Sequence, residues 1–146
     1  PLGRGYDDGL VAALAVCDML DRAPDKSMAD LRRALPKTYQ SPTMSPHCDD
    51  EKKYAIVDQI VAEYEGIAKS GGTIAGQGVR DLVTVNGVRV TLADGTWGLV
   101  RASSNKPELV IVVESPVSEA NKIAMFRDIE ARLAKHPEVG AYNQKI

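Results

Sequence analysis

The dipeptides Asn86-Gly87 and Asp94-Gly95 constrain the fold of this chain more than any other feature. Asn-Gly and Asp-Gly favour tight turns, and here they stand among apolar residues that recur at every second position. These residues are Val83 and Val85 before the first turn, and Val88, Val90 and Leu92 after it. Two further apolar runs follow, TWGLVR (96–101) and ELVIVVE (108–114). Short connections join antiparallel neighbours, so the sequence predicts an antiparallel four-stranded sheet.

Apolar residues at helical spacing predict one helix before these strands and one after them. The first begins near Asp49 or Asp50 and has one apolar side: Tyr54, Val57, Ile60, Val61 and Tyr64. The last begins near Ser118, which can act as its N-cap, and is expected to bury Ile123, Phe126, Ile129 and Leu133. From residue 47 onward the order is helix, four strands, helix. This order predicts an α+β fold in which helices flank the sheet.

A separate helical segment is predicted ahead of the sheet. Asp7 and Asp8 precede its first helix and would complement the helix dipole. The apolar residues of that helix recur at helical spacing: Leu10, Ala13, Leu14, Cys17 and Leu20. We expect Cys17 to pack there as a small hydrophobic side chain. A second helix follows, with Ser27 as its cap and Pro36 as its stop.

A proline-rich stretch separates these helices from the rest of the chain. Residues 36–46 contain three prolines, which is typical of a linker or an edge strand. We therefore expect one unit over residues 1–38 and a second, sheet-containing domain over residues 39–146.

The composition excludes several classes of function. The 146 residues are 44% hydrophobic and 26% charged, as in soluble globular domains. A net charge of -2 provides no basic field for nucleic-acid phosphates, so no nucleic-acid partner is expected. No apolar run approaches the roughly 20 residues that span a bilayer, and no secretory leader is visible, so no membrane partner is expected. Cys17 and Cys48 form no metal or disulfide framework, which favours a cytoplasmic location.

Three other polar or aromatic features are given structural interpretations. GGTIAGQG (71–78) lacks the Lys-Ser/Thr pair of a nucleotide loop, so a mobile surface loop is favoured. The run His47 to Asp50 contains metal-ligand types, but adjacent side chains diverge. A helix cap, in which an Asp accepts backbone N–H bonds, is favoured over a metal site. Trp97 is expected to pack on the sheet.

The connection between the last two strands carries the candidate site. Arg101 ends one strand and Glu108 begins the next, and the residues between them are polar or charged: Ser103, Ser104, Asn105 and Lys106. Arg offers a rigid fork of donors, and successive backbone N–H groups in a turn can enclose an anion. The loop has no nucleophile with a base, so it could hold an anion but not transform it. A solvated hairpin connection explains the same composition, because Ser and Asn form turns.

A longer stretch resembles a known family. NGVRVTLADGTWGLVRASSNKPELVIVVES (86–115) is similar to the C-terminal domain of the α-D-phosphohexomutase superfamily. Its phosphomannomutase/phosphoglucomutase branch has a loop that reads Arg-Ala-Ser-Asn-Thr-x-Pro. Arg101 to Ser103 and Pro107 match this loop, while Ser104 and Asn105 exchange the positions of hydroxyl and amide. Upstream, GYDDGLVAALAVCDML (5–20) resembles the last long helix of the third domain of that family.

The resemblance implies a fold and a role. The fold would be TATA-binding-protein-like, preceded by helices from the end of an α/β domain. The parent enzyme would be an isomerase that moves a phosphoryl group between the 1- and 6-positions of a hexose phosphate, using a phosphoserine and Mg²⁺. Its C-terminal domain grips the phosphate that is not reacting. By the resemblance, the grip would consist of Arg101, Ser103, Ser104, Asn105 and Lys106.

The resemblance also implies what lies elsewhere. The catalytic serine, the Asp-rich metal loop and the sugar-recognition loop have no match here, so no catalytic residue and no metal ligand is assigned to this chain. We expect a C-terminal fragment that is inactive alone and whose partners are the N-terminal domains and a mannose or glucose phosphate. Phosphoglucosamine mutase, a freestanding phospho-ligand module and a protein-interaction domain remain alternatives.

Overall fold

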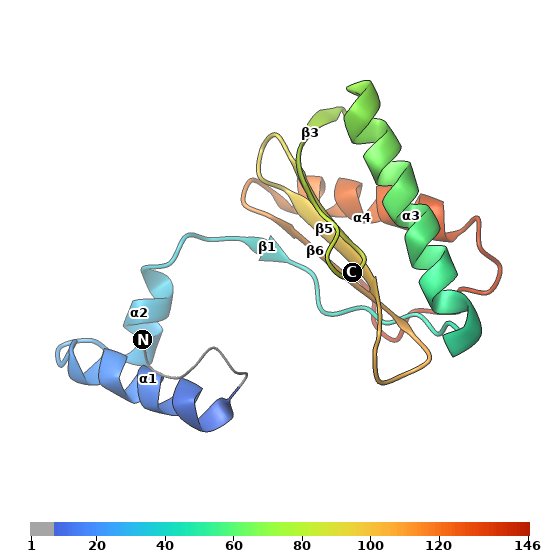
Figure 1. Ribbon diagram of the computed structural model, residues 1–146. Helices are drawn as coiled ribbons and strands as arrows, with labels where there is room; N and C mark the ends of the chain where they lie inside the picture. Colours follow the sequence, from blue (N-terminus) through green and yellow to red (C-terminus); the bar gives the residue numbers. More distant parts are fainter. Residues whose placement is uncertain (1–7) are drawn as a thin grey trace. The chain divides into compact units, whose positions relative to one another are not determined.

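The computed structural model describes residues 8–146 and contains two compact units, one ending at Lys37 and one spanning Thr38–Ile146. The first unit has two helices, α1 (Gly9–Asp21) and α2 (Met28–Arg33) (Figure 1). The carboxylate of Asp8 caps α1 by accepting from the backbone N–H of Leu10 at 2.9 Å. Ser27 caps α2 in a capping box with Asp30. Both caps satisfy N–H groups that a helix start leaves free. Asp7 lies outside the described residues.

The first unit buries none of the described apolar side chains of its two helices. No described residue of α1 or α2 is buried. Leu10 is 78% exposed and Leu14 is 64% exposed. The expectation that Cys17 packs as a hydrophobic residue is wrong for the described part of the chain, because Cys17 is exposed. Two short helices offer too little surface to enclose it.

The second unit is an α+β domain built on one antiparallel sheet (Figure 1). Its strands are β1 (Tyr39–Gln40), β2 (Thr73–Ile74), β3 (Gln77–Val83), β4 (Val88–Leu92), β5 (Trp97–Ala102) and β6 (Leu109–Ser115). The order across the sheet is β1-β6-β5-β4-β3-β2, so the sheet has six strands and not the predicted four. The two additional strands, β1 and β2, are the outermost ones and contain two residues each. Two residues are too few to show the alternation that reveals a strand.

The glycine-rich stretch 71–78 is part of this sheet, so the prediction of a mobile loop is wrong. β2 and the start of β3 pair across a tight turn at Ala75 and Gly76. Ile74 is only 1% exposed and belongs to the core. One buried isoleucine therefore anchors a segment whose glycines favoured a loop. The next hairpin is confirmed, although Val85 lies in its turn and is 92% exposed.

Two helices, α3 (Asp50–Ser70) and α4 (Glu119–Leu133), cover one face of the sheet (Figure 1). α3 contacts β3, β4 and β5, while α4 contacts β1, β5 and β6. α4 passes so close to β5 that a Cβ on Gly98 would lie 2.7 Å from atoms of Met125 and Ile129. Gly98, Val100 and Ala102 are buried under the helices. Because side chains alternate along a strand, Arg101 lies on the opposite face.

The buried sides of the helices differ slightly from the prediction. In α3, Val57, Ile60 and Tyr64 are buried as expected, and Lys53 and Ile56 join them. Tyr54 is 55% exposed, contrary to the prediction. In α4, Ser118 is the N-cap as predicted, and Phe126, Ile129 and Leu133 are buried. Ile123 is only half-buried and Met125 occupies the core.

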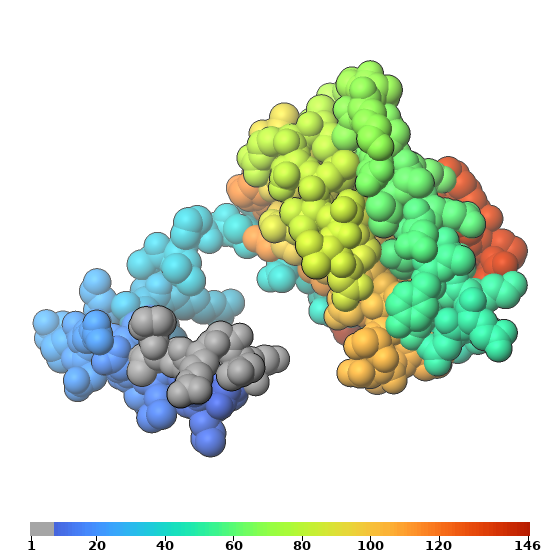
Figure 2. Space-filling model, viewed as in Figure 1, coloured from blue at the N-terminus to red at the C-terminus, as the bar shows by residue number. Residues whose placement is uncertain are grey.

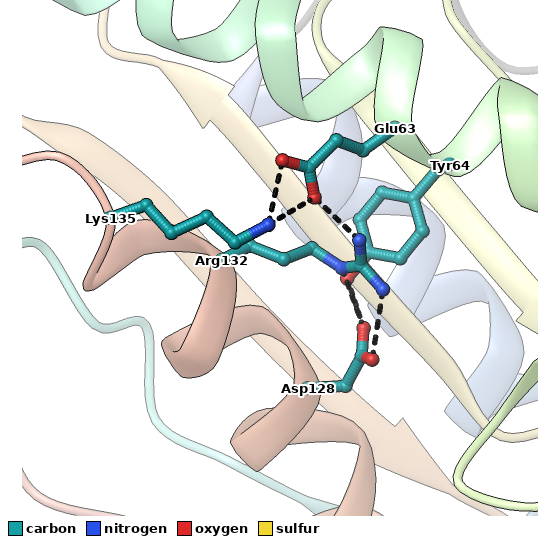
Figure 3. A network of polar contacts seen from close by, with 5 residues as sticks. All are labelled: Glu63, Tyr64, Asp128, Arg132 and Lys135. Atoms are coloured by element: carbon teal, nitrogen blue, oxygen red, sulfur yellow. Dashed lines mark hydrogen bonds and ion pairs between the residues drawn. The ribbon is translucent and has the colours of Figure 1, made fainter.

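A polar network joins the two helices (Figure 3). The hydroxyl of Tyr64 donates to Asp128 at 2.8 Å. Arg132 donates two hydrogen bonds to the same carboxylate and one to Glu63 at 2.6 Å. Lys135 donates to both oxygens of Glu63. Burial alone would raise the pKa of Glu63, but the hydrogen bonds from Lys135 and Arg132 lower it. The charged groups satisfy one another, so we assign the network a structural role.

Candidate functional site

The candidate site is the turn between β5 and β6, residues 103–108. Figure 2 shows its atoms, in orange, at the edge of the second unit beside the first turn of α3. The backbone N–H of Ser103 donates to the carbonyl of Glu108 at 3.0 Å, and the N–H of Glu108 donates to the carbonyl of Lys106 at 2.8 Å. These bonds close the turn. All the residues chosen from the sequence lie in this turn or in the last residues of β5.

Lys53, which the sequence analysis missed, lies beneath the turn. Its side chain extends from α3 and the residue is 2% exposed. The ammonium Nζ donates to the carbonyl of Ser103 at 2.6 Å and to the carbonyl of Lys106 at 3.0 Å. It also donates to the carboxylate of Asp50, one turn earlier on the helix. An ammonium has three hydrogens, and each of them therefore has an acceptor.

The backbone N–H groups of the turn are left available by this arrangement. In a trans peptide the N–H points away from the C=O. Because the carbonyl of Ser103 faces Lys53, the N–H of Ser104 points away from the buried ammonium. Within residues 8–146, no group accepts from the N–H of Ser104, Asn105 or Lys106. Three successive free N–H groups in an exposed turn can bind an anion.

The side chains of the turn differ in accessibility. Ser103 is buried, at 8% exposed, whereas Ser104, Asn105 and Lys106 are exposed. The hydroxyl of Ser104 donates to the side-chain oxygen of Asn105 at 3.3 Å, so the structure brings these two side chains together. This contact leaves the amide NH₂ of Asn105 as a donor for a ligand.

Arg101 approaches the site from the open face of the sheet. It pairs with Val110 across β5 and β6 and is half-buried. Its guanidinium donates to the carbonyl of Ala102 at 3.2 Å and, within the described residues, makes no hydrogen bond or ion pair with the side chains of residues 103–106. Four of the five guanidinium hydrogens therefore remain available.

Gly87 supports Arg101 from the neighbouring hairpin, and the sequence analysis assigned it only a turn. Its φ is 78°, a left-handed conformation that favours glycine. A Cβ at this position would lie 2.2 Å from the carbonyl oxygen of Val100 and 2.7 Å from the Cα of Arg101. The turn before β4 therefore packs directly against the backbone of Arg101. An Asn-Gly pair in a sequence does not reveal this contact.

The segment from His47 to Asp50 lies beside the same turn. His47 pairs with Glu108, and the N–H of Cys48 donates to the carbonyl of Pro107 at 2.9 Å. Asp49 is the N-cap of α3, as predicted, but its carboxylate contacts His47 at 3.1 Å and accepts no backbone N–H bond from the described residues. Burial raises the pKa of the Cys48 thiol.

The described residues do not form a metal centre or a membrane helix. In residues 8–146, no group of three or more His, Cys, Asp or Glu residues could hold a metal ion. No helix in the same range has the length and apolar character needed to cross a membrane.

Trp97 is half-buried, and the guanidinium carbon of Arg89 lies over it, 4.6 Å from the centre of its ring.

Comparisons with known proteins show which family this chain resembles. Residues 47–134 match the family described as phosphoglucomutase/phosphomannomutase, C-terminal domain. The chain is 33% identical, over 111 residues, to the phosphomannomutase/phosphoglucomutase of Pseudomonas putida, covering 76% of this chain and 21% of that protein. It is 31% identical, over 113 residues, to a probable phosphoglucosamine mutase of Methanothermobacter thermautotrophicus, covering 77% and 22%. The chain thus spans about a fifth of the length of these curated relatives.

A solved structure shares the fold. The chain superposes on a phosphoglucomutase/phosphomannomutase family protein from Burkholderia thailandensis with a TM-score of 0.65. The match covers 94% of this chain and 26% of that one, at 24% sequence identity. At this identity the likeness supports the fold alone.

Proposed function

Because the chain belongs to the phosphoglucomutase/phosphomannomutase family through its C-terminal domain, we propose that it binds the phosphate group of a hexose phosphate at the turn between β5 and β6. It would do so within a longer phosphohexomutase, an intramolecular phosphotransferase that interconverts hexose 1-phosphate and 6-phosphate. The phosphate held here would be the one that does not react. The other domains of that enzyme would be its protein partners, with mannose or glucose phosphate as its substrate.

The observation that carries this proposal is the row of free N–H groups on Ser104, Asn105 and Lys106. The N–H of Ser104 points outward, because a buried cation holds the carbonyls of Ser103 and Lys106 from below. Arg101 adds a fork of charged donors on the adjoining strand, and Lys106 adds a second positive charge. Backbone N–H groups and guanidinium are the donors that phosphate oxygens accept most readily. A neutral sugar alone would not require this concentration of donors.

The proposed role is positioning. Holding one phosphate fixes the sugar so that its other end meets the reacting group, and such orientation supplies much of the rate of an enzymatic reaction. Mg²⁺ would neutralise charge on the transferring phosphoryl group in the parent enzyme. The described residues do not fit a Mg²⁺ site, so we derive no step through the metal from this chain.

The test is an NMR titration of the chain with inorganic phosphate and with glucose 1-phosphate. We expect the largest amide shifts between Val100 and Glu108. A few charge-assisted hydrogen bonds, less the cost of desolvation and ordering, give about -4 kcal/mol, or about millimolar affinity. Shifts concentrated in residues 71–78, or none at all in the turn, would refute the proposal.

A phosphoglucosamine mutase is the second candidate for the parent enzyme. The relative from Methanothermobacter thermautotrophicus is 31% identical to this chain, close to the 33% of the Pseudomonas putida relative. The discriminating experiment compares the phosphates of glucosamine, glucose and mannose as substrates of the intact parent protein. A marked preference for glucosamine phosphate would favour this second candidate.

A further inference from the structure

We infer that Lys53 is the positioning residue of the anion-binding turn: its buried ammonium holds the carbonyls at both ends of the turn and thereby directs the N–H donor of Ser104 toward the ligand phosphate. This inference rests on the proposed function and adds to it a residue outside the turn. Lys53 lies in α3, separated by 50 residues from Ser103 and by 53 from Lys106. It therefore ties the turn to the rigid core of the domain.

The burial of Lys53 is unusual enough to need a reason. Lysine is almost never fully buried unless it is paired, because removing its charge from water is costly. Asp50, its only carboxylate partner within the described residues, has a side chain that is 69% exposed. The other two acceptors are backbone carbonyls of a single turn. A methionine could fill a similar volume without the cost of burying a charge, but it would leave the carbonyl of Ser103 without a donor and that of Lys106 with only the N–H of Glu108.

The two bonds determine which way the turn presents its donors. With the carbonyl of Ser103 held inward, the N–H of Ser104 is held outward. The carbonyl of Lys106 belongs to the peptide bond with Pro107. Because proline has no N–H, holding this carbonyl inward does not affect any N–H donor. The residues between these two anchors are Ser104, Asn105 and Lys106, which carry the free N–H groups.

Lys53 also places an ammonium under the site, paired with the carboxylate of Asp50. Its ammonium is within hydrogen-bond distance of the turn backbone but is only 2% exposed, so it does not contact an anion bound on the outer side. A buried charge is screened by salt less than an exposed one. Lys106, by contrast, is exposed. The two lysines therefore contribute differently: one fixes the turn and the other offers an exposed charge.

The experiment compares Lys53→Met with two controls in the full chain. Lys52→Met removes the neighbouring lysine, whose side chain is 55% exposed and contacts Glu138 instead. Ile60→Val should lower the stability of the domain, because Ile60 is a fully buried core residue of the same helix. It removes none of the hydrogen bonds to the turn. Affinity for inorganic phosphate is measured from the amide shifts of Ser104, Asn105 and Lys106, with every variant kept folded.

We expect Lys53→Met to weaken phosphate binding by about tenfold or more, since it removes the anchor that orients the turn and a nearby cation. Lys52→Met and Ile60→Val should bind like the unaltered chain. A role in stability alone would predict equal affinities for Lys53→Met and Ile60→Val once both are folded, and that result would overturn the inference. If Lys53→Met does not fold, Lys53→Leu, which also removes every donor, replaces it, and unchanged affinity would again be decisive against the inference.

The outcomes separate this inference from the proposed function. If the unaltered chain shows no phosphate-dependent shift in the turn, the proposed function fails and the inference fails with it. If the unaltered chain binds and the Lys53 variant binds equally well, only the inference fails.

Discussion

Two cations serve the turn between β5 and β6 in different ways at the scale of single residues. Lys53 is buried and uses all its hydrogens on protein acceptors. Arg101 is half-buried, and its guanidinium donates only to the carbonyl of Ala102 among the described residues. Lys53 is therefore suited to shape the turn, and Arg101 is suited to meet a ligand.

Arg101→Lys should weaken phosphate binding nearly as much as Arg101→Ala. An ammonium is a point charge and cannot reproduce the planar two-bond contact of a guanidinium. Ser103→Ala should have a smaller effect, because it removes one neutral donor from a residue that is mostly buried. The measurement is the NMR titration of the turn amides, with the exposed Arg127 changed to Ala as the control. An Arg101→Ala variant that binds like the parent would show that the wrong residue was chosen.

Gly87→Ala should destabilise the domain by more than about 1 kcal/mol, because alanine is strained at a positive φ and its Cβ would meet the backbone of β5. The same change should displace Arg101 and shift the amide resonances of the turn. Gly66→Ala is the matched control, since Gly66 lies within α3 with no neighbour near a new Cβ. It should stabilise by about 0.5–1 kcal/mol. Chemical denaturation measures both, and equal effects of the two changes would contradict the argument.

At the scale of elements, a carboxylate joins the β4–β5 turn to its surroundings. Asp94 accepts from the backbone N–H of Thr96 at 2.8 Å and from the side chain of Asn121, in α4, at 2.7 Å. Its own N–H donates to Gln77 of β3 at 3.1 Å. Burial alone would raise the pKa of Asp94, but the hydrogen bonds lower it from 3.8 to about 2. The ionised form therefore holds three elements together.

The lowered pKa of Asp94 predicts an acid dependence of stability. A carboxyl whose pKa is lower in the folded state contributes stability that is fully present above its unfolded pKa and lost as the pH falls through its folded pKa. The contribution should therefore decline between about pH 4 and pH 2. The free energy of unfolding, measured by chemical denaturation at several pH values in this range, should decrease less steeply with falling pH for Asp94→Asn than for the unaltered chain. Identical slopes would mean that Asp94 is not linked to folding in this way.

The elements that could be predicted from the sequence are the long ones. β4 and β6 contain enough residues to show their apolar patterns, and the N-cap residue Ser118 marks the start of α4. β1 and β2 could not be predicted, because a strand of two residues shows no sequence pattern and is defined only by its hydrogen bonds to a neighbouring strand.

The position of the candidate turn could be predicted from the sequence, but the orientation of its backbone groups could not. Its polar residues and the family resemblance located it between β5 and β6. The free N–H groups depend on which carbonyls turn inward, and that orientation depends on a lysine some 50 positions earlier. A lysine in a helical sequence indicates exposure by default, so Tyr54 was assigned to the buried side in place of Lys53. Tertiary contacts determine which of these two residues is buried, and no local sequence pattern indicates it.

At the scale of the whole molecule, the two compact units differ in how much they bury. In the described part of the first unit no helical residue is buried, while the second unit has a continuous core that includes Ile60, Ile111 and Ile129. Local opening costs little free energy where few apolar contacts must break. Amide exchange should therefore be fast over residues 10–35 and slow in α3 and β6. Uniform protection along the chain would contradict this expectation.

The chain alone should have no mutase activity on glucose 1-phosphate or mannose 1-phosphate, with or without Mg²⁺. Phosphoryl transfer in this family is expected to need a phosphoserine donor and a metal, whereas the turn offers only donors that hold a phosphate in place. The described residues contain no cluster that could bind the metal. A coupled assay on highly purified chain measures this, and Arg101→Ala serves to identify contamination, because a contaminating mutase would be unaffected by that change. Turnover that disappears in Arg101→Ala would show that the chain itself performs chemistry and that positioning is not its whole role.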